Sequence, residues 1–191
     1  MSEHRDGGGT FRKLWPKEWH KFRDHLLRLD KKSRHLRFAH GVSDSFIEDY
    51  AQHMSELGSI VYAYFVDDEI RGAAEMKKLG GVWGREAEAA FSVESAYQDM
   101  GIGTELMGRI IRAARNRGVQ QLIMSCLTEN TRMQSIARKH EADLRFEYDE
   151  VVGEIVPKDP NYFSILAEAV EDRMGMMLTV LDLQRRLTKA A

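Results

Sequence analysis

The segment from 89 to 107 contains a glycine-rich turn that leads directly into a predicted helix. The turn reads Gln98-Asp-Met-Gly101-Ile-Gly103-Thr104, and it follows an apolar strand-like run that ends at Val93. The first N–H groups of a helix lack partners within the helix and carry a partial positive charge, so a helix start can bind phosphate. Glycine at two positions lets the backbone approach a diphosphate without a side chain between them. The pattern therefore indicates a phosphate-binding turn, and a plain tight turn remains the alternative.

Two well-known phosphate loops do not fit this turn. A dinucleotide-binding loop has a third glycine three residues after the second, but that position is Leu106, and the turn lies in the middle of the chain rather than after an early first strand. A P-loop has a lysine before its Ser or Thr, and Gly103-Thr104-Glu105 has none. The sequence therefore predicts neither of these two classes.

Hydrophobic periodicity predicts the elements that must position the turn. Two helices come first, over 17–30 and from Ser43 onward, with an N-cap candidate at Ser43. His20 and His25 are predicted on the polar face of the first helix. The remaining predicted elements are strands over 10–15, 60–66, 69–79, 86–93 and 119–127, helices over 104–117 and 130–140, and one or two strands over 144–156, broken near Gly153. This order predicts an α/β protein with a mixed sheet and helices on its faces.

Composition limits the class of protein. Hydrophobic residues make up 43% of the 191 residues and charged residues 30%, which is enough apolar material for a core. A formal net charge of −2 lacks the basic footprint of a general nucleic-acid binder, so no nucleic-acid partner is expected. The single cysteine, Cys126, excludes an internal disulfide, and the seven histidines show no metal-ligand spacing, so no metal is predicted.

No apolar run approaches the ~20 residues of a membrane helix, and the N-terminal segment has no apolar signal core. We therefore expect a cytoplasmic protein without a membrane contact. The expected organisation is a flexible lead-in over 1–9, one domain over 10–156, and a helical extension over 157–191 that begins at Pro157 and Pro160.

The C-terminal extension carries an apolar stripe at spacings of three and four residues. The stripe consists of Leu166, Val170, Met174, Met177 and Leu181. Two interpretations stay open: the stripe packs back on the sheet of its own chain, or it pairs with a second copy to form a homodimer. Gly175 could interrupt the helix.

Val93, Gln98, Gly101 and Gly103 match the V-x-x-x-x-Q/R-x-x-G-x-G/A signature of the GNAT superfamily of acyl-CoA-dependent N-acyltransferases. The resemblance covers roughly residues 10–156, because 122–126 resembles the fifth strand of that fold and 130–137 the helix that flanks coenzyme A. It implies a GNAT fold, with a largely antiparallel sheet covered by helices on both faces. It also implies acetyl-CoA as the co-substrate.

A narrower resemblance concerns the acceptor. The segment 29–38, together with Asn130, Met133, Ile136 and Ala137, is similar to the acetyltransferase domain of bacterial protein-lysine acetyltransferases. That likeness implies a protein lysine as acceptor.

The resemblance also implies which residues bind acetyl-CoA. Met100 to Thr104 would bind its diphosphate through backbone N–H groups, and the strand at 91–93 would pair with its pantetheine arm, splayed open by a bulge. Asp99 is expected to face solvent, because a carboxylate beside a diphosphate is unfavourable. The predicted acetyl-CoA site comprises Phe91, Ser92, Val93, Gln98, Asp99, Met100, Gly101, Ile102, Gly103, Thr104, Asn130 and Met133.

An amine acceptor must lose a proton, since a lysine with a pKa near 10.4 is almost entirely protonated at pH 7. A carboxylate can take that proton. Glu88 is the first candidate, because related lysine acetyltransferases carry an acidic base near this position; Glu75 is the second, and Glu86 shares the face of Glu88. The tyrosine acid of many GNAT enzymes is replaced by Ala137, for which Ser135 or Tyr148 could substitute.

The resulting hypothesis is an N-acetyltransferase that joins acetyl-CoA and a primary amine by direct attack in a ternary complex, since no placed nucleophile indicates a covalent intermediate. A protein lysine is the favoured acceptor. The alternatives are a small-molecule amine as acceptor, and a weakly catalytic acyl-CoA-binding sensor or interaction module.

Overall fold

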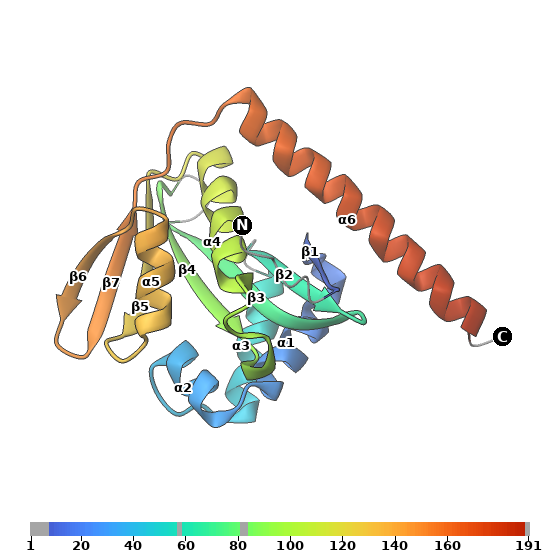
Figure 1. The fold of residues 1–191 in the computed structure, drawn as a ribbon, viewed down its shortest axis with the longest axis horizontal. Coiled ribbons are helices and arrows are strands. Elements are labelled where there is room, and N and C mark those ends of the chain that lie inside the picture. Colours follow the sequence, from blue (N-terminus) through green and yellow to red (C-terminus); the bar gives the residue numbers. More distant parts are fainter. Residues whose placement is uncertain (1–7, 57–58, 81–83, 190–191) are drawn as a thin grey trace.

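The computed structural model describes residues 8–56, 59–80 and 84–189, and these form a twisted sheet of seven strands with helices on both faces (Figure 1). The strand order is β1-β2-β3-β4-β5-β7-β6, and β4 and β5 are parallel while the other neighbours are antiparallel. The strands are β1 (Thr10–Lys13), β2 (Ile60–Val66), β3 (Glu69–Leu79), β4 (Glu86–Val93), β5 (Gln121–Leu127), β6 (Asp143–Glu147) and β7 (Glu150–Ile155). The predicted mixed α/β sheet is confirmed.

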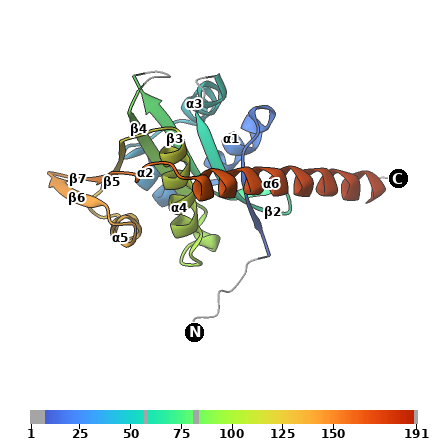
Figure 2. The same cartoon turned by 90° about the horizontal axis from the view of Figure 1, so that it is seen from above.

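Two hydrophobic clusters lie on opposite faces of the sheet, beneath the helices that Figure 2 shows on either side of it. On one face, α1 (Trp19–Arg28) and α3 (Asp44–Glu56) bury Phe22, Leu26 and Ile47 against β2 and β3. On the other face, α4 (Ile102–Asn116) packs on β2, β3 and β4, and α5 (Thr131–Lys139) lies beside it. Side chains that alternate along β2 fall into the two clusters in turn, which is the pattern of a strand buried on both faces.

The N-terminal region contains one helix more than the sequence predicted. The chain begins this region with a 3-10 turn, η1 (Pro16–Glu18), and the predicted helix over 17–30 ends at Arg28. A separate helix, α2 (Lys31–Phe38), follows because Leu29 is extended and Asp30 caps the new helix by accepting from the Ser33 N–H at 2.8 Å. The Asp-x-x-Ser pattern was therefore a helix start, whereas we predicted a helix end there.

The strands at the far edge turn at a different place from the prediction. The chain turns at Tyr148 and Asp149, and Gly153 lies inside β7. A Cβ atom at Gly153 would lie 3.0 Å from Leu144 and 3.1 Å from Met124. Glycine is therefore needed at this position for close packing and not for a break in the strand.

The C-terminal helix α6 (Tyr162–Lys189) is continuous through Gly175, so the predicted interruption is wrong. A Cβ at Gly175 would lie 3.0 Å from the Cβ of Arg12, so the glycine lets α6 approach β1. The helix crosses α4 and β1 and extends past the β1 edge of the sheet (Figures 1 and 2). No helix among the described residues is long and apolar enough to cross a bilayer. Residues 1–7 of the predicted lead-in, and Gly81, lie outside the described residues.

Candidate functional site

A pocket of about 350 Å³ opens where β4 and β5 separate. The two strands pair only from Glu86↔Gln121 to Glu88↔Ile123, and β4 then continues to Val93 paired on its β3 side alone. The expected bulge is absent from this part of β4, because its pairing with β3 keeps one register throughout. The strands therefore separate without a bulge, and the part of β4 beyond the last pair lines the pocket. Its lining residues come from four regions: Ser33, Leu36 and Arg37 of α2; Phe91, Ser92 and Val93 of β4; Tyr97, Gln98, Asp99, Gly101, Ile102, Gly103 and Thr104 of the turn; and Asn130, Arg132, Met133, Ser135, Ile136 and Lys139 of α5 and its cap.

The glycine turn forms one wall of this pocket. Gly101 has φ +81°, a conformation that favours glycine, and it is the N-cap of α4. The helix's first bond runs from the Glu105 N–H to the Gly101 carbonyl at 3.0 Å, so the amides at 102–104 precede the helical ladder. A Cβ at Gly103 would lie 2.8 Å from Ile136, so this glycine lets the start of α4 approach α5. The backbone can thus present free N–H groups to an anion.

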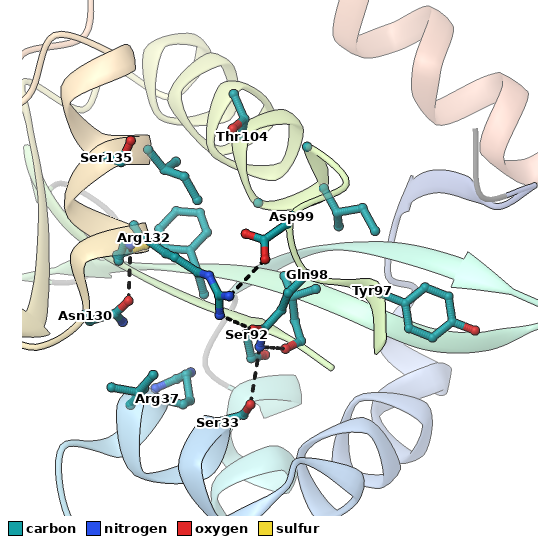
Figure 3. Close-up of a pocket in the computed structure, with 18 of the residues that line it drawn as sticks. Ser33, Arg37, Ser92, Tyr97, Gln98, Asp99, Thr104, Asn130, Arg132 and Ser135 are labelled. Carbon is teal, nitrogen blue, oxygen red and sulfur yellow. Dashed lines mark hydrogen bonds and ion pairs between the residues drawn. The ribbon is translucent and has the colours of Figure 1, made fainter. Parts of the chain in front are cut away.

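Gln98 ties three walls of the pocket together (Figure 3). Its amide nitrogen donates to the Val93 carbonyl at 2.9 Å and to the Ser33 hydroxyl at 3.3 Å, and its amide oxygen accepts from Arg132 at 2.6 Å. Val93 ends β4, Ser33 lies on α2 and Arg132 on α5. One side chain therefore fixes how β4, α2 and α5 approach one another.

Arg132 is a pocket residue that the sequence analysis missed. It donates to Gln98 and to the Asp99 carboxylate, the latter at 2.9 Å, so it neutralises the acid that seemed unfavourable in a phosphate-binding turn (Figure 3). Both partners of this ion pair are largely exposed, which agrees with the solvent-facing Asp99 that we expected. The pairing joins residues 33 positions apart, and periodicity and local motifs give no signal for such a contact.

The structure brings the predicted acetyl-CoA residues together at this pocket, with one exception. All of them except Met100 line it. The Met100 side chain is exposed. Asn130 has a second task as the N-cap of α5, where its side chain accepts from the Met133 N–H at 3.1 Å.

The two predicted carboxylate bases lie in different surroundings, and neither lines the pocket. Glu88 is exposed, and it is the last residue of β4 that pairs with β5. Glu75 is buried on β3, where it accepts from Arg37 and from the Tyr50 hydroxyl. Burial raises the pKa of Glu75 despite the Arg37 charge, and burial also raises the pKa of Tyr50. Glu75 thus belongs to a buried cluster whose arginine lines the pocket.

His25 is fully buried, so its predicted place on a polar helix face is wrong. Its Nε2 lies 2.9 Å from the Ser92 Oγ, and its Nδ1 lies 3.2 Å from the Glu94 carboxylate. Burial lowers the pKa of His25 even though Glu94 acts in the opposite direction. Burial disfavours ionisation of Glu94, but hydrogen bonds from His25 and Arg71, together with the positive charge of Arg28, outweigh it and lower its pKa to about 2.

The position of the usual tyrosine acid is filled by a packed side chain. Ala137 is buried in the core cluster under α4, so no proton donor stands there. Of the two hydroxyls considered as substitutes, Ser135 lines the pocket, whereas Tyr148 is fully exposed in the turn between β6 and β7. The described residues bring together no His, Cys, Asp and Glu group able to hold a metal ion.

The sequence matches one protein-family model, and the fold superposes on several solved acetyltransferase structures. The model of the acetyltransferase (GNAT) family matches residues 15–141. The GNAT domain of S. lividans PAT superposes with a TM-score of 0.68 at 21% identity, covering 80% of this chain and 93% of that domain. A ribosomal-protein-alanine N-acetyltransferase from Brucella melitensis gives 0.59 at 14% identity, covering 77% and 99%. YncA, a putative acetyltransferase from Salmonella typhimurium solved with its cofactor acetyl-CoA, gives 0.58 at 14% identity, covering 80% and 96%. At these identities the superpositions establish the fold.

Proposed function

The chain belongs to the GNAT family of acetyltransferases, and we propose that it transfers an acetyl group from acetyl-CoA to the side-chain amine of a protein lysine. The family membership gives the reaction class, an acyl-CoA-dependent N-acetyl transfer. The choice of lysine, the residues that act and their roles are our proposal.

One observation carries the proposal most directly: the pocket is lined by the part of β4 that has separated from its parallel neighbour β5, and it is bounded by a glycine turn at a helix start. A thioester carrier with a diphosphate at one end and a long amide-containing arm needs such a site. The turn supplies N–H groups for the diphosphate, and the β4 edge facing β5 beyond Glu88 is available to the arm. The positive φ of Gly101 and the close approach at Gly103 are features that side chains would disturb.

The charges on α5 also fit an anionic carrier. Arg132 and Lys139 both line the pocket and are exposed at its rim. In the structure Arg132 is paired with Asp99. A bound phosphate group would be a second anion for the same guanidinium, and a hydrogen bond between such charged groups is a strong one. We propose that Arg132 contributes to acetyl-CoA affinity through this charge.

We propose Glu88 as the base for the attacking amine. It lies where β4 and β5 part, just before the stretch of β4 that lines the pocket, and it lies on the same side of the sheet as Glu75. The electrostatic influence of Glu88 reaches both of those groups. An exposed carboxylate at this point can accept the ammonium proton directly or through water. Glu75 is committed to Arg37 and Tyr50, so we assign it the positioning of Arg37.

The exposure of Glu88 supports a macromolecular acceptor. A base at the surface can be reached by a lysine on a folded partner, whereas a small amine is usually enclosed in a pocket. The narrower resemblance to protein-lysine acetyltransferases points the same way. A small-molecule amine and a sensor without turnover are the outcomes that the experiment must separate from this proposal.

The test is CoA release from acetyl-CoA over a panel of lysine peptides, folded proteins and small amines, with acetylation located by mass spectrometry. Turnover on lysine side chains supports the proposal. Turnover confined to small amines contradicts the acceptor. Tight acetyl-CoA binding with no turnover on any amine supports the sensor and contradicts the enzyme.

A further inference from the structure

A chain of three polar side chains, of which the first two are buried, runs from the pocket into the α1 face of the sheet and on to Glu94. Ser92 lines the pocket, and its hydroxyl lies 2.9 Å from the Nε2 of His25. The Nδ1 of His25 lies 3.2 Å from Glu94, which also accepts from Arg28 and from Arg71, each at 3.0 Å. His25 has no exposed side-chain surface, and Ser92 retains only 8% exposure. The imidazole of His25 is therefore shielded from water, and the chain meets solvent only at its two ends, through Ser92 in the pocket and through Glu94, whose side chain keeps 13% exposure.

The chemistry of the three groups assigns every proton in this chain. Glu94 is ionised, and a carboxylate can only accept, so the His25 Nδ1 carries a proton and donates it to Glu94. Burial keeps the imidazole neutral, which leaves Nε2 without a proton. Nε2 must then accept, and the Ser92 hydroxyl is the group that donates to it.

This assignment fixes what Ser92 can offer to the pocket. A serine hydroxyl has one proton and two lone pairs. Because the proton is committed to His25, only lone pairs remain for a bound molecule. Ser92 therefore acts as a hydrogen-bond acceptor in the pocket, and it selects for an N–H or O–H donor.

Its position along β4 identifies the donor. Ser92 lies four residues after Glu88 on the same face of the strand, about 13 Å at the rise of an extended chain. It precedes the turn that starts at Gln98. If the thioester end lies near Glu88 and the diphosphate at the turn, Ser92 faces the arm between them. The arm of acetyl-CoA carries two secondary amides, each with one N–H.

We propose that Ser92 accepts a hydrogen bond from an amide N–H of the pantetheine arm, and that His25, held by Glu94, sets the polarity of that hydroxyl. The inference rests on the proposed function, since it takes the carrier to be a coenzyme A thioester. It adds a side-chain contact to the pantetheine arm, which a nucleotide without that arm cannot make. His25 and Glu94 are positioning residues that act through Ser92.

The experiment compares two probes by isothermal titration calorimetry: coenzyme A, and 3′-phosphoadenosine 5′-diphosphate, which lacks the arm. Ser92→Ala is expected to weaken coenzyme A binding about five-fold, the effect of one neutral hydrogen bond, and to leave the affinity for the nucleotide probe unchanged. Ser92→Cys keeps a side chain of similar size, but its sulfur is a poorer hydrogen-bond acceptor than the serine oxygen. This variant tests the contact if Ser92→Ala does not fold. Ser125→Ala, an exposed serine of β5 outside the pocket lining, is the matched control and should change neither affinity.

A second measurement examines His25 itself. The imidazole ¹⁵N shifts of wild type should show a neutral ring with the proton on Nδ1, and the Nε2 signal should move in Ser92→Ala. His25→Gln, whose amide oxygen can still accept from the hydroxyl, should retain more coenzyme A affinity than His25→Leu. If His25 had only a structural role, His25→Gln and His25→Leu would each lose affinity for coenzyme A and for the nucleotide probe to the same extent.

The outcomes separate the two levels of the argument. Unchanged coenzyme A affinity in Ser92→Ala and Ser92→Cys, an equal loss for both probes, or an imidazole with its proton on Nε2 each overturns the inference alone. A wild-type protein that binds neither probe contradicts the proposed function, and the inference with it.

Discussion

At the scale of single residues, the assignment of the base depends on where Glu88 lies. It occupies the point at which β4 leaves β5, whereas Glu75 is held by Arg37 and Tyr50. Glu86 lies two residues earlier on the same face and is also exposed, so it provides a local control.

Glu88→Gln should lower kcat about a hundred-fold or more, because the amide cannot take the amine proton, with little change in KM for acetyl-CoA. Steady-state kinetics with the best acceptor peptide measures both constants. Glu86→Gln should stay near wild type. A Glu88→Gln enzyme within a few-fold of wild type, or an equal loss in Glu86→Gln, rules out this base.

Arg132 is expected to contribute to acetyl-CoA binding through its charge at the pocket rim. Arg132→Ala should raise KM for acetyl-CoA about five-fold at low salt, and the effect should shrink as ionic strength rises, since its ion pair is exposed. Arg145→Ala removes a similarly exposed, paired arginine on β6 outside the pocket lining. An equal KM change in both variants, or none in Arg132→Ala, contradicts the role.

At the scale of elements, the β1 edge of the sheet is joined to η1 by a partly buried ion pair. Arg12 contacts both Glu18 oxygens, at 2.7 and 2.8 Å, and its guanidinium stacks on Phe65 at 3.7 Å. Burial disfavours the charge on Glu18, but Arg12 and Lys21, with the Trp15 N–H, lower the pKa of its carboxyl to about 2.

Glu18→Gln should therefore destabilise the fold at pH 7 by about 2 kcal/mol, because it removes the carboxylate that Arg12 contacts most closely and leaves only Asp68, at 3.9 Å. Because the pKa of Glu18 is lower in the folded state, its ionised carboxylate stabilises the fold fully at pH values above 4.5, the pKa of the unfolded state. That stabilisation disappears as the pH falls toward 2. Urea unfolding at pH 7, 4 and 3 should show the difference between wild type and Glu18→Gln shrinking with acid. Asp143→Asn, in an exposed pair, is the control. A difference that is constant with pH would refute the ion-pair explanation.

The elements show which sequence signals were sufficient. The apolar periodicity of 104–117 and the β-branched run at 60–66 predicted α4 and β2, since each element must bury its face. The start of α2 was missed because its signal is a single capping residue, Asp30, within a stretch that contributes no buried side chain. Gly153 was misread because glycine marks a break in a strand as often as a close contact.

The candidate site divides in the same way. The glycine turn and the residues around it were predictable, because a helix start that binds phosphate is encoded locally. Three contacts of the site were not predictable: Arg132 with Asp99, Arg37 with Glu75, and His25 with Ser92. Each of these contacts joins residues at least 33 positions apart, and only the folded topology determines them.

At the scale of the whole molecule, α6 packs with its polar face inward. Glu168 and Glu171 reach Arg117, Arg109 and Arg112, and Asn116 donates to the Ser164 carbonyl. The predicted apolar stripe faces outward: Leu166, Val170, Met174 and Met177 are all exposed. These four side chains therefore do not pack on the sheet of their own chain, the side chain of Leu181 lies outside the described part of the structure, and the homodimer stays a prediction.

If the stripe pairs with a second copy, Val170→Glu combined with Met174→Glu should convert a dimer into a monomer, because two buried like charges would repel. Light scattering across a hundred-fold range of concentration measures the mass. Arg173→Glu, an exposed change between them, is the control. A wild-type chain that is monomeric throughout this range contradicts the homodimer.

The central claim is that the amide groups at the start of α4 hold the diphosphate of acetyl-CoA. A crystal structure of the chain with coenzyme A tests it most directly. We predict diphosphate oxygens within hydrogen-bond distance of the N–H groups between Gly101 and Thr104, with the arm along β4 toward Glu88. A diphosphate bound elsewhere, with this turn unoccupied, would contradict the account.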